Sequence, residues 1–120
     1  MDGIVIYHNP SCGTSRTTLA LLRERGHEPQ VVEYLQAGWT RELLEELFQR
    51  MAIRPREALR VRGTSAHELG LTDPTASDAA ILAAMVLDPI LVERPIVVTP
   101  NGAALCRPAD LVLSLLEESS

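Results

Sequence analysis

Residues 4–16 read IVIYHNPSCGTSR, and this stretch decides the fold. Its β-branched start, residues 4–7, predicts a strand, and the Asn-Pro-Ser after it predicts a turn. Leucines at helical spacing predict a helix over residues 17–25. We therefore expect Cys12 at the N-terminus of that helix, where unpaired amides and the positive end of the helix dipole favour an anion. A cysteine placed there is a candidate for a thiolate at neutral pH.

The chain continues with a second strand and a helical segment. Gly26 is expected to end the first helix, and residues 30–34 are expected to form a strand parallel to the first. Thr40 is a plausible N-cap for the next helix, and Ser77 or Asp78 for the helix after it. Between these helices prolines and glycines break the pattern, which indicates short helical pieces and turns. The positions expected in the core are two apolar stripes, Leu43 to Met51 and Ile81 to Leu87.

The last part of the chain predicts a β-hairpin and a closing helix. Strands are expected at residues 96–98 and 104–106, joined by Thr-Pro-Asn-Gly, in which Asn-Gly is a strong turn signal. Pro108 is expected to begin a final helix through Leu116. This order predicts an α/β, thioredoxin-like fold, with a mixed four-stranded sheet flanked by helices and a helical insertion. The sequence shows no linker or repeat, so residues 1–120 are expected to form a single domain.

Composition argues against several function classes. A net charge of −5 disfavours broad electrostatic binding to nucleic acid or to an anionic membrane, since both reward a basic surface. No apolar run approaches the roughly 18 residues of a membrane span, and the first residues show no signal-peptide pattern. Cys12 and Cys106 lie far apart without metal-ligand spacing, which fits a reducing compartment. We therefore expect a cytoplasmic protein without a metal site.

Two kinds of cysteine site are disfavoured by the residues around Cys12. The phosphate loop of tyrosine phosphatases has the spacing C-x5-R, whereas Arg16 gives C-x3-R and Thr18 stands at the phosphatase arginine position. A dithiol oxidoreductase needs a resolving cysteine where this chain has Ser15. Any disulfide chemistry must therefore use a thiol from elsewhere. The chain contains no lysine, and all 11 basic residues are arginines, so a single arginine is weak evidence for an oxyanion site.

Five motifs follow one another along nearly the whole chain. They are YHNPSCGTSR at residues 7–16, ELGL at 68–71, PIL at 89–91, RPIVVTP at 94–100 and LCRP at 105–108. Together they closely resemble the motifs of the glutaredoxin-dependent arsenate reductases. Because the resemblance rests on several motifs in one order, it is far more specific than a single signature.

The resemblance implies roles for individual residues. Cys12 matches the family's catalytic cysteine, the thiolate that attacks arsenate. The arginines that match those holding the oxyanion and stabilising the thiolate are Arg60, Arg94 and Arg107. His8 and Ser15 match residues thought to support the thiolate by hydrogen bonding. Pro95 matches the cis-proline that faces the reactive loop in thioredoxin-like folds.

The resemblance also implies a reaction and its partners. Cys12 forms an adduct with arsenate, glutathione attacks the adduct as As(V) is reduced to As(III), and glutaredoxin resolves the mixed disulfide on Cys12. No bound cofactor is implied, because glutathione acts as a co-substrate. The physical chemistry agrees with these roles, since arsenate is a dianion and guanidinium groups are planar, permanently charged donors. Several cations are needed to neutralise both the oxyanion and the thiolate.

Some assignments stay open at this level. Arg56 and Arg62 are close enough to Arg60 that composition does not choose among them, and the match of Arg60 rests on its spacing to Glu-Leu-Gly-Leu. Arg16 is expected to be a surface residue more than a substrate ligand, and Cys106 a buried thiol.

Two other functions remain as alternatives. One is a glutathione-linked thiol oxidoreductase that acts on protein mixed disulfides. The other is a relative of the Spx-type regulators, which contact RNA polymerase on the same fold. Those regulators commonly carry a C-x-x-C switch, which Ser15 interrupts here.

Overall fold

The computed structural model describes residues 3–116, which fall into two compact units. One unit combines the chain up to residue 37 with the chain from residue 94 onward. The other contains Gly38–Glu93.

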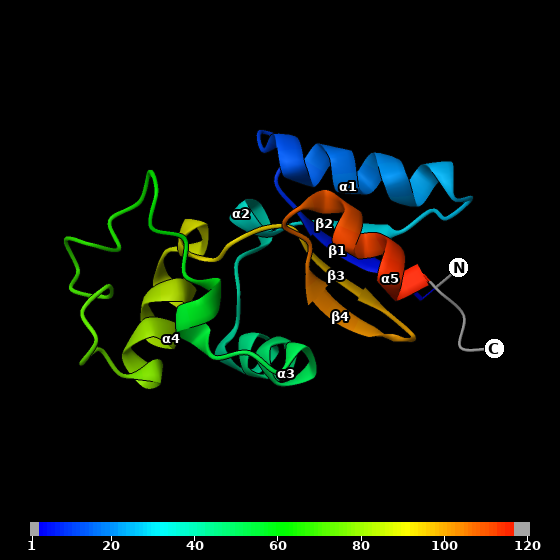
Figure 1. Cartoon of the computed structure of the whole chain (residues 1–120). Coiled ribbons are helices and arrows are strands. Elements are labelled where there is room, and N and C mark those ends of the chain that lie inside the picture. The colour runs from blue at the N-terminus through cyan, green and yellow to red at the C-terminus, as the bar shows by residue number, and fades with distance from the viewer. Residues whose placement is uncertain (1–2, 117–120) are drawn as a thin grey trace. The chain divides into compact units, whose positions relative to one another are not determined.

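The first unit is built on a mixed four-stranded sheet (Figure 1). Its strands are β1 (Val5–His8), β2 (Gln30–Glu33), β3 (Ile96–Thr99) and β4 (Gly102–Leu105), in the order β2-β1-β3-β4. β1 is parallel to β2 and antiparallel to β3, and β3 is antiparallel to β4. The predicted β-α-β unit and hairpin are confirmed, although β4 ends at Leu105 and so excludes Cys106.

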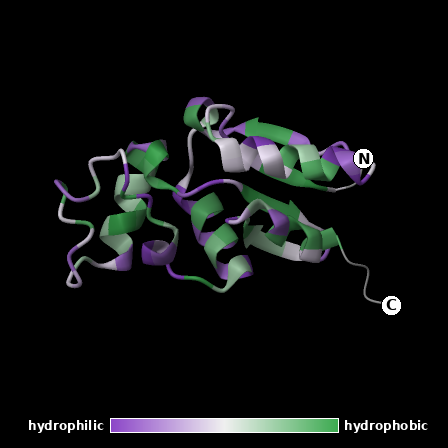
Figure 2. Ribbon diagram, turned by 45° about the horizontal axis from the view of Figure 1, so that its top comes forward, coloured by the Kyte–Doolittle hydropathy of each residue, from purple (hydrophilic) through white to green (hydrophobic). Residues whose placement is uncertain are grey.

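Two helices cover one face of this sheet. α1 (Gly13–Glu24) and α5 (Val112–Leu116) contact each other and lie along the same side of the strands (Figure 1). In Figure 2 the strands are mostly green, the hydrophobic end of the scale. The buried cluster on this side consists of Ile4, Ile6, Leu22, Val97, Cys106 and Val112. Burial of this apolar surface is the main force that holds the helices on the sheet.

The register of the strands brings three loops to one end of the sheet. Tyr7 of β1 lies opposite Ile96 of β3, so the end of β1 meets the start of β3. Ile96 in turn lies opposite Leu105, so the end of β4 meets the same point. The loops after β1, before β3 and after β4 are therefore neighbours. They carry Cys12, Arg94 and Arg107.

α1 begins at Gly13, earlier than the predicted start at residue 17. The Arg16 N–H already donates to the carbonyl of Cys12 at 3.0 Å, so the helix starts directly after the turn. Its first residues are small and polar, which left no apolar spacing from which to predict it. The predicted end is confirmed, because Gly26 has a φ of 84° and its N–H donates to the carbonyl of Arg23 at 3.0 Å.

Two other boundaries differ from the prediction. Tyr34 does not extend β2 but begins a short helix, α2 (Tyr34–Ala37). The ladder stops at Glu33 because its partner His8 is the last residue of β1. The closing helix does not start at Pro108, since a 3₁₀ turn, η3 (Ala109–Leu111), precedes α5.

The second unit is helical, as predicted for the insertion. Its elements are α3 (Arg41–Met51), η1 (Pro55–Ala58), α4 (Asp78–Leu87) and η2 (Pro89–Leu91). α3 and η1 both pack against α4. Within residues 3–116 no helix is long and apolar enough to cross a membrane.

Side-chain caps start both long helices of this unit. The Thr40 hydroxyl accepts a hydrogen bond from the Leu43 N–H at 3.1 Å, which confirms Thr40 as the cap of α3. The Ser77 hydroxyl accepts one from the Ala80 N–H at 3.1 Å. Of the two residues proposed to cap α4, Ser77 is therefore the cap, and Asp78 is the first helical residue.

The predicted apolar stripes are buried only in part. Leu44, Leu47 and Phe48 are buried in α3, as are Ile81, Leu82 and Met85 in α4. Leu43 and Met51 are half-buried. Leu87 is 86% exposed, so its predicted place in the core is wrong. Because α4 is apolar on nearly every side, its sequence does not define which positions face the core.

Candidate active site

Cys12 lies in a tight turn between β1 and α1. Its N–H donates to the carbonyl of Asn9 at 3.0 Å, and the Asn9 side-chain oxygen accepts a hydrogen bond from the Ser11 N–H at 2.9 Å. Asn9 is buried and thus shapes the turn through both its backbone and its side chain. Cys12 occupies the N-cap position of α1, as predicted, and is only 8% exposed. Its thiol therefore lies at the unpaired amides of the first helical turn.

His8 and Ser15 brace this turn from within the fold. The Ser15 hydroxyl lies 2.6 Å from His8 Nδ1 and accepts a hydrogen bond from the Asn9 N–H at 3.0 Å. Burial lowers the pKa of His8, and although Glu33 opposes this shift, two nearby arginines reinforce it. His8 is therefore neutral at neutral pH. The Ser15 hydroxyl therefore links the His8 ring to the backbone of the turn, through Nδ1 on one side and the Asn9 N–H on the other.

Two arginines from the neighbouring loops reach the thiol. Arg107 Nη1 lies 3.8 Å from Cys12 Sγ and also donates to the carbonyl of Arg94 at 3.0 Å. The Arg94 side chain acts on Cys12 through its charge and through a hydrogen bond. Arg94 is half-buried and Arg107 is exposed, so one member of this cationic pair is partly shielded from solvent and the other faces it. The structure thus brings together Cys12, Arg94 and Arg107.

These surroundings change the ionisation of the thiol. Burial by itself raises the pKa of Cys12, but three stabilising groups outweigh it and the pKa lies below its ordinary value. The groups are the Ser15 backbone N–H, the Arg94 guanidinium and the Arg107 guanidinium. A lower pKa increases the fraction of thiolate at neutral pH, and the thiolate is the nucleophilic form of cysteine.

Pro95 lies next to Arg94, and the peptide bond between them is cis, as the motif predicted. Its carbonyl accepts a hydrogen bond from the Cys106 N–H at 2.9 Å. This bond ties the segment before β3 to the segment after β4, and so keeps Arg94 and Arg107 near each other. The Arg107–Pro108 bond is also cis, which the sequence did not predict.

Arg60 belongs to the second unit, so its predicted contact with the oxyanion stays a prediction. Its backbone N–H donates to the carbonyl of Leu91 at 2.8 Å, and its Nε donates to the carbonyl of Arg62 at 3.1 Å. Arg62 is exposed. Arg56 is half-buried and directs its guanidinium at backbone carbonyls of residues 73–76. The structure therefore separates three arginines that composition left equivalent.

Arg16 is exposed, as expected, but it also contacts the reactive turn. Its Nη1 donates to the carbonyl of Pro10 at 2.8 Å, so the side chain folds back over the turn that holds Cys12. The sequence predicted Arg16 as a surface residue and Asn9 as a turn residue, but not the contacts that both make with the reactive turn. These contacts depend on the path of the backbone between β1 and α1, and the spacing of residues in the sequence does not define that path.

The second cysteine has a different environment. Cys106 is fully buried, and burial raises its pKa to about 12. Its thiol therefore stays protonated at neutral pH and is a poor nucleophile. The described part of the chain contains no group of three or more His, Cys, Asp or Glu side chains that could hold a metal ion.

The fold and the site together define a class of protein. A thioredoxin-like sheet carries one activated cysteine after its first strand, and arginines from the neighbouring loops surround it. Comparison with known sequences identifies the family: this chain belongs to the ArsC family, whose sequence model matches residues 7–115. The family that the motifs predicted is thereby confirmed.

Several relatives are similar over most of their length. An arsenate reductase of Synechocystis sp. is 54% identical over 114 residues, which cover 95% of this chain and 81% of the relative. The arsenate reductase of Escherichia coli is 44% identical, with 99% of this chain and 84% of the relative covered. The solved structure of an arsenate reductase from Vibrio cholerae has a TM-score of 0.88 and 44% identity, covering 92% of this chain and 95% of the other. The predicted fold class is confirmed by this likeness.

Proposed function

We propose that this protein reduces arsenate to arsenite, with Cys12 as the nucleophile and with glutathione and glutaredoxin as the reductants. The observation that carries the proposal is the 3.8 Å contact between Arg107 Nη1 and Cys12 Sγ, next to Arg94. One cationic pair can stabilise the thiolate and attract an oxyanion to it. The names of the relatives, which are arsenate reductases, support the choice of arsenate as the oxyanion.

In the first step the Cys12 thiolate attacks arsenic to form a sulfur–arsenic bond, and one arsenate hydroxyl takes up a proton and leaves as water. This proton balances the one that the Cys12 thiol lost when it ionised. The attack brings two anions together, so it needs cations at the point where their charges meet. Arg94 and Arg107 supply them from the sheet end, and the resemblance adds Arg60 as the third oxyanion ligand. His8 and Ser15 support the step by holding the turn in place.

In the second step a glutathione thiol attacks the sulfur of Cys12 in the adduct. A disulfide bond forms between Cys12 and glutathione, the sulfur–arsenic bond breaks, and its electron pair goes to arsenic. Arsenic thus gains two electrons and leaves as arsenite, and the two thiols lose one electron each. The overall reaction consumes two thiols and yields one disulfide and one water.

The mixed disulfide on Cys12 must then be reduced by a thiol from outside the chain. Cys106 is unsuited to this task because it is fully buried and its pKa is about 12. A glutaredoxin using the cell's glutathione fits the requirement, since thiol exchange needs an accessible thiolate. In this proposal glutathione is a co-substrate, no cofactor is held by the protein, and the reaction takes place in the cytoplasm.

The test is arsenate-dependent oxidation of NADPH in the presence of glutathione, glutaredoxin and glutathione reductase. We expect Cys12→Ser to abolish turnover and Cys106→Ala to retain it, because only Cys12 is activated. Turnover by the wild type no higher than by Cys12→Ser would refute the assignment of arsenate as the substrate. Reduction of a glutathionylated protein by the same inactive preparation would instead support a thiol oxidoreductase acting on mixed disulfides.

A further inference from the structure

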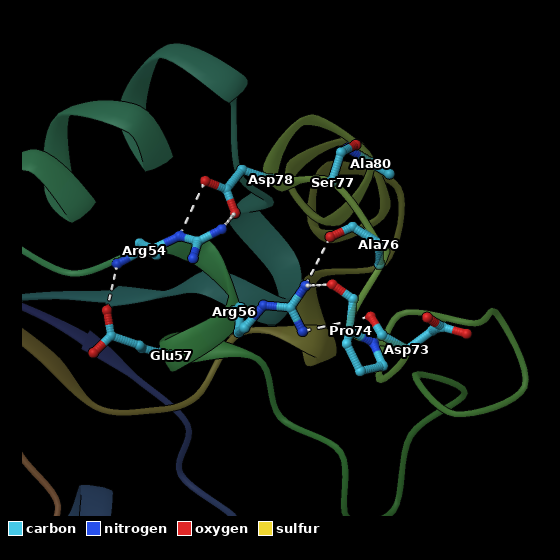
Figure 3. Close-up of polar contacts among 9 residues, drawn as sticks. All are labelled: Arg54, Arg56, Glu57, Asp73, Pro74, Ala76, Ser77, Asp78 and Ala80. Atoms are coloured by element: carbon cyan, nitrogen blue, oxygen red, sulfur yellow. Dashed lines mark hydrogen bonds and ion pairs between the residues drawn. The ribbon is translucent and has the colours of Figure 1, made fainter.

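Arg56 directs its guanidinium at backbone carbonyls of one segment of the chain. Its Nη2 donates to the carbonyl of Ala76 at 2.7 Å and contacts that of Pro74 at 3.5 Å, and its Nη1 contacts that of Asp73 at 3.5 Å (Figure 3). One half-buried guanidinium thus serves three backbone acceptors of the segment that leads into α4. Carbonyls outside helices and strands still need donors, and the planar five-donor guanidinium can meet several at once.

The segment between η1 and α4, residues 59–77, is a chain of turns that carries Arg60. Its start is fixed where the Arg60 N–H meets the carbonyl of Leu91 at 2.8 Å. Its end is fixed where Arg56 holds residues 73–76. Arg56 lies in η1, the turn that directly precedes this segment. Its side chain therefore connects the start of the loop to its end.

The Arg60 side chain rests on this same loop. Its Nε donates to the carbonyl of Arg62 at 3.1 Å, and its Nη2 would lie 3.8 Å from a Cβ built on Gly63. The Thr64 hydroxyl donates to the carbonyl of Arg60 at 2.8 Å. The guanidinium of Arg60 is therefore held by the turn at residues 60–64, and its position depends on the order of the loop.

We propose that Arg56 is a positioning residue: its guanidinium clamps residues 73–76 to η1 and thereby fixes the loop that carries Arg60. This inference rests on the proposed function, in which Arg60 is an arsenate ligand. Loss of the clamp loosens the loop, so arsenate binds less well while the chemistry at Cys12 proceeds unchanged once arsenate is bound.

A matched control lies two positions away. Arg54 precedes η1 and pairs with Asp78 at the start of α4, with Nη2 and Oδ1 3.0 Å apart (Figure 3). This ion pair is exposed and contacts no carbonyl of the loop, and Ser77 caps α4 without it. Arg54→Ala removes the same charge from the same neighbourhood without removing the clamp.

The experiment measures arsenate KM and kcat for the wild type, Arg56→Ala, Arg56→Lys and Arg54→Ala. We expect Arg56→Ala to raise KM by about fivefold or more, with kcat within about twofold, and Arg54→Ala to leave both nearly unchanged. Arg56→Lys keeps the charge but loses the planar fork, so it should behave like Arg56→Ala. Full rescue by lysine would overturn the clamp in favour of a simple charge effect.

A double-mutant cycle and hydrogen exchange complete the test. If Arg56 acts through Arg60, adding Arg56→Ala to Arg60→Ala should raise KM no further, whereas multiplied effects would overturn the proposal. Amide exchange of residues 61–76 should accelerate in Arg56→Ala and Arg56→Lys but not in Arg54→Ala. Unchanged exchange would also overturn it. Exchange does not depend on arsenate, so a wild type that fails to reduce arsenate refutes the proposed function and still leaves the clamp to be judged.

Discussion

The chemistry of single residues in the first unit explains how one cysteine can serve without a resolving partner. Cys12 and Cys106 are both buried, yet the pKa of the first is lowered and that of the second is raised to about 12. Burial acts in the same direction on both thiols. The pKa of Cys12 is nevertheless lowered, because the Ser15 N–H and the two arginines stabilise its thiolate. Among the described residues no such group acts on Cys106, whose pKa is shifted by burial alone.

The activation of Cys12 can be measured through its rate of alkylation by iodoacetamide against pH. We expect the midpoint to lie below that of free cysteine, because Arg94 and Arg107 stabilise the thiolate. Arg107→Ala should move the midpoint upward, since one stabilising donor is lost. Arg25→Ala, which removes an exposed arginine after α1, serves as the control and should leave the midpoint in place. A wild-type midpoint equal to that of free cysteine would contradict the activated thiolate.

Site residues were predictable from sequence to different degrees. The element order already placed Cys12 at a helix start, and the resemblance of the RPIVVTP and LCRP motifs marked Arg94 and Arg107. The contacts of Asn9 and Arg16 were not predictable, because they depend on the exact path of one turn. The contacts of Arg56 could not be predicted from the sequence either, because its partners are backbone carbonyls, which every residue type carries.

At the scale of elements, signals with a local physical cause were the most reliable. The hairpin turn, the Thr40 cap and the Gly26 stop act through backbone geometry within a few residues, and all three were predicted. The hairpin loop, however, consists of Pro100 and Asn101, because Gly102 already belongs to β4. The errors arose where a distant element decides the outcome. β2 ends where its partner β1 ends, and the exposure of Leu87 depends on which side of α4 is packed.

The N-cap of α3 offers a test of element stability. Thr40→Ala removes the acceptor for the Leu43 N–H and should lower the free energy of unfolding by about 1 kcal/mol. Thr40→Ser keeps the oxygen and should restore most of the loss. Thr17→Ala, at an exposed position inside α1, is the control and should change stability by about 0.5 kcal/mol or less. Thermal or urea unfolding followed by circular dichroism measures the series, and equal stability of Thr40→Ala and wild type would contradict the cap.

At the scale of the whole molecule, overall charge and local charge have opposite signs. The chain carries a net charge of −5, yet Arg16, Arg94 and Arg107 gather around the reactive turn. Because charge interactions are screened within about 8–10 Å at physiological salt, an oxyanion near Cys12 responds mainly to this local cluster. That the two compact units act as a single domain, as the sequence suggested, stays a prediction.

Buried His8 links the stability of the folded chain to pH. Burial lowers its pKa in the native state below the ordinary value of 6.5, so near and below that pH the unfolded chain binds a proton that the native state does not. The free energy of unfolding should therefore fall as the pH drops from 7 through 6.5, and one proton limits the slope to about 1.4 kcal/mol per pH unit. The loss should stop growing once the native ring also takes up a proton.

Urea unfolding in steps of pH, with matched variants, isolates this contribution. His8→Asn places a side-chain amide where Nδ1 meets the Ser15 hydroxyl, and an amide can either donate or accept there, so the variant keeps a hydrogen bond while removing the titration. We expect its stability to fall less steeply with acidification than that of the wild type. His67→Asn, at an exposed position, should keep the wild-type slope. If the wild type and His8→Asn instead lose stability in parallel, His8 titrates in the native state as it does in the unfolded chain. That result would contradict the inference that a neutral His8 ring braces the Cys12 turn.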